Sequence, residues 1–153
     1  MMDFNAYWMG RDLKYAAELK PIYVSNARKL VARINMLLGM FCEDTGIIID
    51  TWASGWRPPE VNDATSNAAA SSTHRTGEGG DIRDKNRAFA AWCILHKEAL
   101  SECGLYMEDP RWTPTWVHLQ THPPASGKLV YIPSTKPALA SALPGQTPNR
   151  AIV

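Results

Sequence analysis

A run of apolar residues spaced three and four positions apart is the feature of this chain that most restricts its fold. Its members are Val24, Ala27, Leu30, Val31, Ile34, Leu37, Leu38 and Phe41. This spacing forms one side of an amphipathic α-helix. Ser25 is a suitable cap for its start, and Gly46 is a suitable stop. The sequence therefore predicts a long helix that ends at Gly46.

Further elements of both kinds follow that helix. The β-branched run at residues 47–49 predicts a short buried strand. Asp84 and Gly104 bound a second helical pattern. Strands joined by proline-containing turns are expected at Leu105–Met107, Thr115–Thr121 and Leu129–Ile132. The predicted fold class is α+β, with a small antiparallel sheet and helices packed against it.

Composition limits the partners that such a domain can have. The chain has 153 residues, 45% of them apolar, which suits one domain with a sizeable core. Its 16 basic and 15 acidic side chains leave a net charge near +1, so we expect no nucleic-acid partner and no attraction to an anionic membrane. The N-terminus lacks a signal-peptide pattern, and no run approaches the roughly 18 apolar residues of a membrane span. We therefore expect synthesis in a reducing cytoplasm and no membrane insertion.

The cysteines and the C-terminal residues complete the domain plan. Cys42, Cys93 and Cys103 are odd in number and lack CxxC spacing, so we expect buried, reduced thiols rather than a disulfide framework. Residues 133–153 contain four prolines among small residues and show no periodicity. The sequence thus predicts one domain over residues 1–132 and a surface tail over 133–153, which could contact a partner.

The stretch SSTHRTGEGGDIRD, from Ser71 to Asp84, has only one large apolar side chain, Ile82, and is too polar to build a core. His74 and Asp81 lie within it, seven residues apart and separated by glycines. An imidazole nitrogen and a carboxylate oxygen are both good zinc ligands, and zinc is often held by three protein groups with a fourth position left for water. Long stretches without regular structure in compact domains are often functional. This stretch is therefore a candidate metal loop that needs a third ligand.

His118 is the candidate third ligand. In the predicted strand TWVHLQT, alternation places Trp116, His118 and Gln120 on one face. Val117 and Leu119 then point into the core. A histidine flanked by inward-facing apolar residues on a strand is well placed to reach a cleft.

Spacing alone leaves other interpretations open. A single histidine near a glycine-rich loop is more often exposed or part of a turn than a ligand. Asp81 could instead cap a helix or pair with Arg83. His96 and His122 are expected to be structural or exposed, because one lies in a helical pattern and the other precedes a proline.

Three blocks of the chain resemble, in order, the signature of the M15 peptidases. They are SGWRPPEVN (Ser54–Asn62), STHRTGEGGDI (Ser72–Ile82) and TWVHLQ (Thr115–Gln120). The family pattern S-x-H-x-x-G-x-[AG]-x-D-[IV], with a later W-x-H strand, is met at Ser72, His74, Gly77, Gly79, Asp81, Ile82, Trp116 and His118. The segments AYWMGRDLKYAAEL and THPPASGKLVYIPS also resemble those of short phage-encoded members. The resemblance implies a hedgehog/DD-peptidase-like α+β fold and a zinc ion held by His74, Asp81 and His118.

The resemblance also implies roles for residues around the metal. Substrate-binding positions correspond to Ser54, Arg57, Ser72, Trp116 and Gln120, and the two serines are expected to brace loops rather than act as nucleophiles. Arg57 offers a planar fork of donors suited to a carboxylate or a developing oxyanion, which makes it a catalytic candidate. The alternative interpretation is that Arg57 is a surface arginine held by Glu60 or Asp63.

The general base is the role that the resemblance does not assign directly. Many family members carry an acid three residues before the last histidine ligand, where Thr115 stands here. Threonine cannot accept a proton in this way. Among nearby groups, Asp109 is the predicted substitute, with Glu108 beside it and Glu78 and His122 as weaker candidates. Gly77 and Gly79 are expected to let the backbone turn tightly between the ligands, with alanine tolerated.

These features together predict a zinc peptidase that acts on bacterial peptidoglycan. Its substrate would be a peptide bond in the stem peptides or cross-links, and the choice between carboxypeptidase and endopeptidase stays open. Without an export signal, such an enzyme would be a phage endolysin that reaches the periplasm and cell wall after holin action, or a murein hydrolase carried in a virion. The alternative is a structural phage tail protein that keeps the fold and docks on other virion proteins through residues 133–153.

Overall fold

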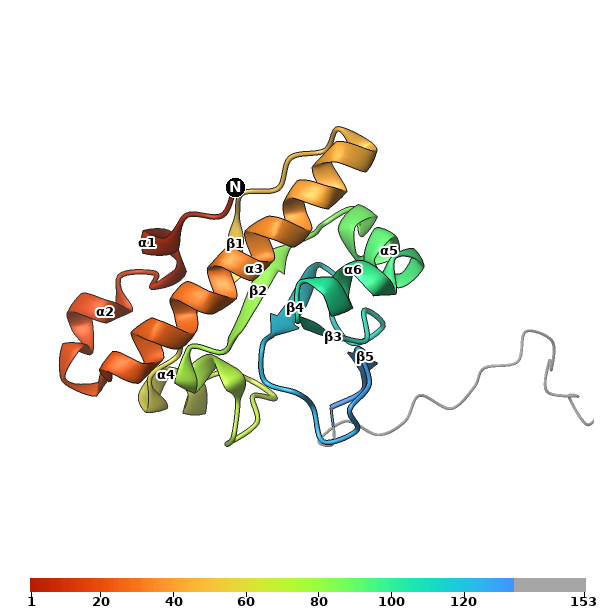
Figure 1. Cartoon of the computed structure of the whole chain (residues 1–153). Coiled ribbons are helices and arrows are strands. Elements are labelled where there is room, and N and C mark those ends of the chain that lie inside the picture. Colours follow the sequence, from red (N-terminus) through yellow and green to blue (C-terminus); the bar gives the residue numbers. More distant parts are fainter. Residues whose placement is uncertain (134–153) are drawn as a thin grey trace, which may run out of the picture.

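The computed structural model of the protein describes residues 1–133, which form a five-stranded sheet and the helices packed on it (Figure 1). The helices are α1 (Phe4–Tyr7), α2 (Arg11–Lys14), α3 (Pro21–Thr45), α4 (Pro59–Asp63), α5 (Ala88–Leu95) and α6 (Lys97–Glu102), with 3-10 turns η1 (Ala16–Glu18) and η2 (Thr73–Thr76). The strands are β1 (Trp52–Ser54), β2 (Gly79–Arg83), β3 (Tyr106–Glu108), β4 (Trp116–Gln120) and β5 (Val130–Tyr131). The predicted α+β class is confirmed.

The sheet has the strand order β1-β2-β4-β3-β5. Neighbouring strands are antiparallel except for β3 and β5, which are parallel. The sheet is therefore mixed at one edge rather than wholly antiparallel. Strand β4 is central, with β2 on one side and β3 on the other, so its side chains can meet residues from both neighbours.

Helix α3 confirms the predicted apolar stripe and crosses one side of the sheet (Figure 1). Its stripe residues from Ala27 to Phe41 are buried. Gly46 ends the helix in the left-handed conformation, with φ of 71°, as predicted. The predicted start at Ser25 is wrong, because Pro21 occupies the first helical turn, where its fixed φ and missing N–H suit a helix start.

The segment after α3 differs from its prediction. Residues 47–49 form no strand, and Ile48 is 72% exposed. The strand forms later, at β1, where Trp52 pairs with Ile82 of β2 and its indole N–H donates to the Asp3 carbonyl over 2.9 Å. Burial and a strand partner thus place the strand at Trp52, whereas the β-propensity of residues 47–49 is not enough to form one without them.

The second predicted helix is two helices. Helices α5 and α6 are separated at His96, whose backbone is not helical. Asp84 does serve the start of α5, because its carboxylate accepts N–H groups of Phe89 and Ala90 at 3.3 and 2.8 Å. Strands β3, β4 and β5 fall within or one residue beyond the predicted ranges.

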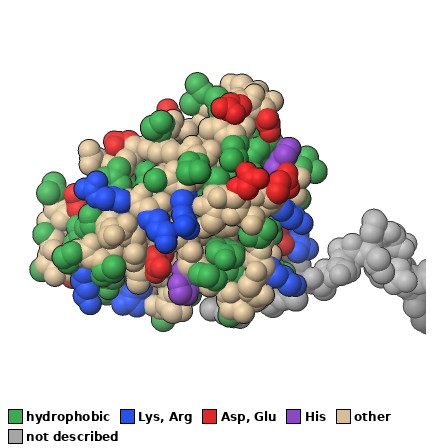
Figure 2. All heavy atoms as spheres, viewed as in Figure 1, with side chains coloured by type: hydrophobic (Ala, Val, Ile, Leu, Met, Phe, Trp, Pro, Cys, Tyr) green, Lys and Arg blue, Asp and Glu red, His purple; other side chains and the backbone are tan. Residues whose placement is uncertain are grey.

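One face of the sheet packs into the core and the other carries polar side chains. Val117 and Leu119 of β4 are buried in the apolar cluster, as predicted from alternation. Cys93 and Cys103 are buried free thiols, and Cys42 is half-buried. On the side of the molecule in Figure 2, basic and acidic side chains are interspersed, in keeping with the small net charge.

Two further points concern membrane spans and the tail. No helix among residues 1–133 is long and apolar enough to cross a membrane. The predicted tail, apart from Pro133, lies outside the described residues.

Candidate metal centre

His74, Asp81 and His118 meet at one buried point. His74 Nε2 lies 3.2 Å from Asp81 Oδ1 and 3.2 Å from His118 Nδ1. His118 Nδ1 lies 2.7 Å from the same Asp81 oxygen. All three residues are buried. The sequence prediction that distant segments bring these three side chains together is therefore confirmed.

The converging atoms have the spacing of metal ligands. A metal ion bound tetrahedrally at about 2.1 Å from each ligand separates the ligand atoms by about 3.4 Å. The two distances of 3.2 Å are close to this spacing, and the 2.7 Å pair would widen by about 0.7 Å around an ion. Within residues 1–133 this group could hold a metal ion.

The ligand atoms that face away from the common point are also engaged. His74 Nδ1 lies 2.7 Å from the Gly55 carbonyl oxygen, which can only accept, so this nitrogen carries the proton and Nε2 presents its lone pair. His118 Nε2 lies 3.3 Å from the Gln120 side-chain oxygen. The two histidines thus offer different ring nitrogens, each fixed by a hydrogen bond on its other side.

Arg57 holds the carboxylate ligand, Asp81. Its Nη2 donates to Asp81 Oδ2 over 2.7 Å, and its Nε donates to Ser54 Oγ over 2.9 Å. With one carboxylate oxygen on the arginine, Asp81 directs the other toward the histidines. Arg57 is not the surface arginine of the alternative interpretation, because its partners are Ser54 and Asp81 rather than Glu60 or Asp63.

Burial and charge act against each other on the ionisable groups. Burial alone would raise the pKa of Asp81, but the two histidines beside it hold that pKa well below its usual range. Burial lowers the pKa of His74 despite the nearby carboxylate. For His118, burial is outweighed by the hydrogen bond and charge of Asp81, so its pKa is raised. An ionised acid and an unprotonated His74 are the forms that bind metal.

Turn η2 and strand β2 carry His74 and Asp81 on a tightly packed backbone. Ser72 caps η2, and its hydroxyl accepts the His74 N–H at 3.4 Å, which confirms a bracing role. Gly77 follows with φ of 76°, and a Cβ there would lie 2.3 Å from the Tyr23 carbonyl oxygen. A Cβ on Gly79 would lie 2.2 Å from Thr73 Oγ1. The expectation that alanine is tolerated at these glycines is therefore wrong.

A row of side chains runs across the sheet through the site. The strand registers pair Ser54 with Asp81, Asp81 with His118, and Glu108 with Tyr131. The pairs between β3 and β4 are Tyr106 with Gln120 and Met107 with Leu119, and the next step along both strands sets Glu108 opposite His118. Directly paired residues project from the same face. Glu108 therefore belongs to the site, and its charge contributes to the raised pKa of His118.

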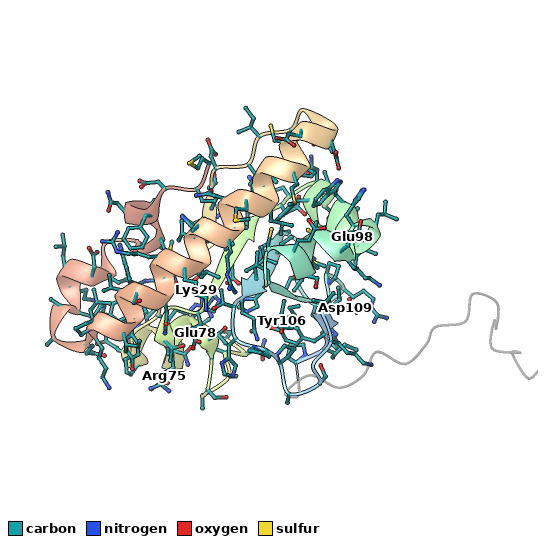
Figure 3. All side chains as sticks on the ribbon, viewed as in Figure 1. Lys29, Arg75, Glu78, Glu98, Tyr106 and Asp109 are labelled. Atoms are coloured by element: carbon teal, nitrogen blue, oxygen red, sulfur yellow. The ribbon has the colours of Figure 1, made fainter. Side chains whose placement is uncertain are left out.

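The predicted base, Asp109, has a different environment. Its carboxylate is bound by Arg111, whose Nη2 donates to Oδ2 over 2.6 Å and whose Nε lies 3.0 Å from Oδ1. Glu108 is one residue earlier and inside the strand. Across the view of Figure 3, Tyr106 lies between Glu78 on one side and Asp109 on the other. Strand register was the signal that could have selected Glu108 over its neighbour.

The remaining candidates lie at the margins of the site. Glu78 accepts a hydrogen bond from the Thr76 hydroxyl, and its other oxygen lies 3.7 Å from His122 Nδ1. Thr115 is exposed just before β4, and its carbonyl accepts the Asp84 N–H. Trp116 is half-buried on the same face of β4 as His118, two residues away. It lies where a substrate-lining residue is expected.

Gln120 is more enclosed than a substrate-binding role requires. It is 6% exposed, and its side-chain oxygen lies near His118, Tyr131 and Thr73. Sequence reasoning identified neither Tyr131 nor Thr73 as part of the site.

Comparison of the chain with protein-family models, with curated proteins and with solved structures finds no match. The M15 resemblance therefore rests on the quoted motifs, and the geometry of the site stands independently of it.

Proposed function

We propose that this protein is a zinc peptidase that hydrolyses peptide bonds in the stem peptides or cross-links of bacterial peptidoglycan. The observation that carries the proposal is the buried convergence of His74 Nε2, Asp81 Oδ1 and His118 Nδ1, with each outward-facing ligand atom engaged by another group. Two imidazoles and one carboxylate are a ligand set used by catalytic zinc sites. The choice of peptidoglycan rests on the motif resemblance.

The donor set suits zinc in its protonation state and charge. Two neutral imidazoles and one carboxylate leave a net positive charge on a divalent ion. When bound, zinc supplies Lewis acidity and makes hydroxide available near neutral pH.

Glu108 is the residue best placed to move a proton in this reaction. It stands opposite His118 in the register of β3 and β4, on the face that carries the ligands. A carboxylate there can take a proton from an attacking water and pass it to the leaving amine. The proposal therefore assigns the general base to Glu108 in place of the Asp109 predicted from sequence.

Arg57 has two tasks in the proposal. Its Nη2 donates to Asp81 and its Nε donates to Ser54. These two contacts orient the Asp81 carboxylate whether or not a substrate is bound. Contact with a substrate carbonyl or carboxylate then falls to Nη1. Trp116 lines the same face and contributes apolar contact with the peptide.

Digestion of peptidoglycan tests the proposal. Purified protein is incubated with peptidoglycan, with zinc or with a chelator, and the products are identified by mass spectrometry. We expect new peptide termini in the zinc sample and none in the chelated sample. Glu108→Gln is expected to lower the rate by about 10² to 10⁴ with zinc still bound.

Asp109→Asn is the matched control, because it removes a neighbouring carboxylate without touching the row. Its rate is expected to stay within about threefold of the wild type. Absence of chelator-sensitive peptide cleavage by the wild type would refute the peptidase. Loss of activity in Asp109→Asn but not in Glu108→Gln would return the base to Asp109.

The sites of cleavage would also decide the open question of reaction type. Release of a single terminal residue would define a carboxypeptidase, and internal cleavage an endopeptidase. The virion-component alternative concerns residues 133–153, almost all of which lie outside the described part of the chain, and it stays a prediction.

A further inference from the structure

The side-chain amide of Gln120 is a meeting point for four groups beside the candidate metal centre. Its oxygen accepts from the Tyr131 hydroxyl over 2.6 Å and from the Thr73 hydroxyl over 3.3 Å. The same oxygen lies 3.3 Å from His118 Nε2. Its nitrogen donates to the His122 carbonyl over 2.6 Å. The amide thus joins η2, β4, β5 and the segment after β4.

These contacts fix which way round the amide lies. A carbonyl oxygen only accepts, so the group facing the His122 carbonyl must be the NH₂. The amide oxygen therefore faces Tyr131, Thr73 and His118. The orientation follows from the partners, which is the evidence needed to assign an amide.

The oriented oxygen determines the proton position on His118. An acceptor beside Nε2 favours a proton on that nitrogen. On the other side of the ring, Nδ1 lies 2.7 Å from Asp81 Oδ1. A carboxylate oxygen and a nitrogen lone pair repel each other at this distance, so a cation bound to Nδ1 is favoured. Both contacts are favourable together only when Nδ1 holds a cation, either a proton or a metal ion. Burial of the ring makes the loss of either contact costly.

We infer that Gln120 is a positioning residue, locked by Tyr131, Thr73 and the His122 carbonyl, that holds His118 with Nε2 protonated and Nδ1 directed at the metal. This inference rests on the proposed zinc site and reassigns Gln120 from substrate contact to ligand orientation. Outer partners of ligand histidines commonly affect metal affinity by 10- to 100-fold.

Zinc affinity of the folded full-length chain, measured against a competing chelator, tests the inference. Gln120→Met keeps the length of the side chain but removes the acceptor, and we expect its zinc Kd to rise by about 10- to 100-fold. Gln120→Glu keeps an acceptor beside His118 Nε2 but loses the donor to the His122 carbonyl, so it should rescue zinc binding in part, with a Kd between those of the wild type and Gln120→Met. This rescue would not occur if position 120 only filled space.

The His118 ring gives a second readout that packing alone would not change. In zinc-loaded protein labelled with ¹⁵N-histidine, we expect His118 to show a protonated Nε2 and a metal-bound Nδ1. His74 is the internal control, because its ring should show the reverse pattern in the same spectrum. Gln120→Met should lose the protected Nε2–H signal of His118 and keep the His74 pattern.

Two milder variants keep the test decisive if Gln120→Met does not fold. Tyr131→Phe and Thr73→Val each remove one donor to the amide and leave Gln120 in place. Each should weaken zinc binding by a few fold, with the larger effect for Tyr131→Phe because its contact is shorter.

Unchanged zinc Kd and unchanged His118 signals in Gln120→Met, or in both milder variants, would overturn the inference. Failure of the peptidase proposal looks different. A wild type that binds zinc with the predicted ring pattern but cleaves no peptidoglycan would refute the activity and support the role of Gln120.

Discussion

The two faces of strand β4 show how differently neighbouring residues of this chain are constrained. Val117 and Leu119 point into the apolar cluster, where many side chains of similar kind surround them. His118 and Gln120 point the other way, and each polar atom has a particular partner. The apolar face is stabilised by side-chain volume and packing, whereas the polar face requires specific pairs of donor and acceptor atoms.

This difference predicts that the two faces can be damaged separately. Loss of packing lowers the free energy of unfolding but leaves the ligand geometry of folded molecules unchanged. Loss of a ligand or its partner lowers metal affinity with a smaller effect on the metal-free fold.

Removal of a ligand should have the largest effect. His118→Ala takes away one of three protein ligands, so we expect zinc affinity to fall by at least about 10³-fold. Zinc should raise the melting temperature of the wild type and leave that of the variant unchanged, because a ligand stabilises only the state it binds. Equal zinc-dependent stabilisation of both proteins would remove His118 from the site.

Leu119→Ala is the matched change on the opposite face, one residue away. Leu119 is fully buried, and truncation of a buried leucine costs about 2–5 kcal/mol of unfolding free energy. Denaturant unfolding measures this cost. The zinc Kd of the folded variant should stay within about threefold of the wild type, and a large rise in Kd would show that the two faces are not independent.

Gly79→Ala should produce an intermediate effect on the polar face. The new Cβ would lie 2.2 Å from Thr73 Oγ1 and 3.1 Å from His118 Cε1, so both must move. We expect a loss of about 1–3 kcal/mol in unfolding free energy, together with weaker zinc binding. Gly39→Ala in α3 is the control, because nothing lies within 4 Å of its Cβ, and alanine there should stabilise by up to about 1 kcal/mol.

Asp109→Asn should have the smallest effect. Hydrogen bonds from Arg111 hold the pKa of Asp109 below its usual range. Because the folded pKa is depressed, the pair contributes stability above the unfolded value of 3.8, and this contribution is lost as pH falls through the folded value. Arg111 is exposed, so solvent screening keeps this contribution small. A difference between wild type and variant that does not shrink as the pH falls below 3.8 would contradict this account.

The parts of the fold that follow from local periodicity were predictable. The stripe from Ala27 to Phe41 and the stop at Gly46 identify α3 because apolar spacing and glycine conformation are properties of the local chain. Strand β4 follows for the same reason, since alternation separates His118 from Leu119. The errors arise where tertiary contacts decide. Ile48 has strong β-propensity but no strand partner, whereas Trp52 has one.

The ligands of the site could be predicted from the sequence, but the residues that surround and orient them could not. His74, Asp81 and His118 are residue types that bind metals, so they stand out in a sequence. Glu108 differs from Asp109 only through strand register, which places one of two adjacent acids opposite His118. The contacts of Gln120 need β5 beside β3, a parallel pairing that the sequence did not indicate.

The most direct test of the account is X-ray absorption at the zinc edge on wild-type protein loaded with one equivalent of zinc. We expect a four-coordinate site with nitrogen and oxygen neighbours at about 2.0–2.2 Å and multiple scattering from two imidazoles. A zinc ion that remains free in solution, or one with sulfur neighbours at about 2.3 Å, would contradict the assignment of the metal to His74, Asp81 and His118.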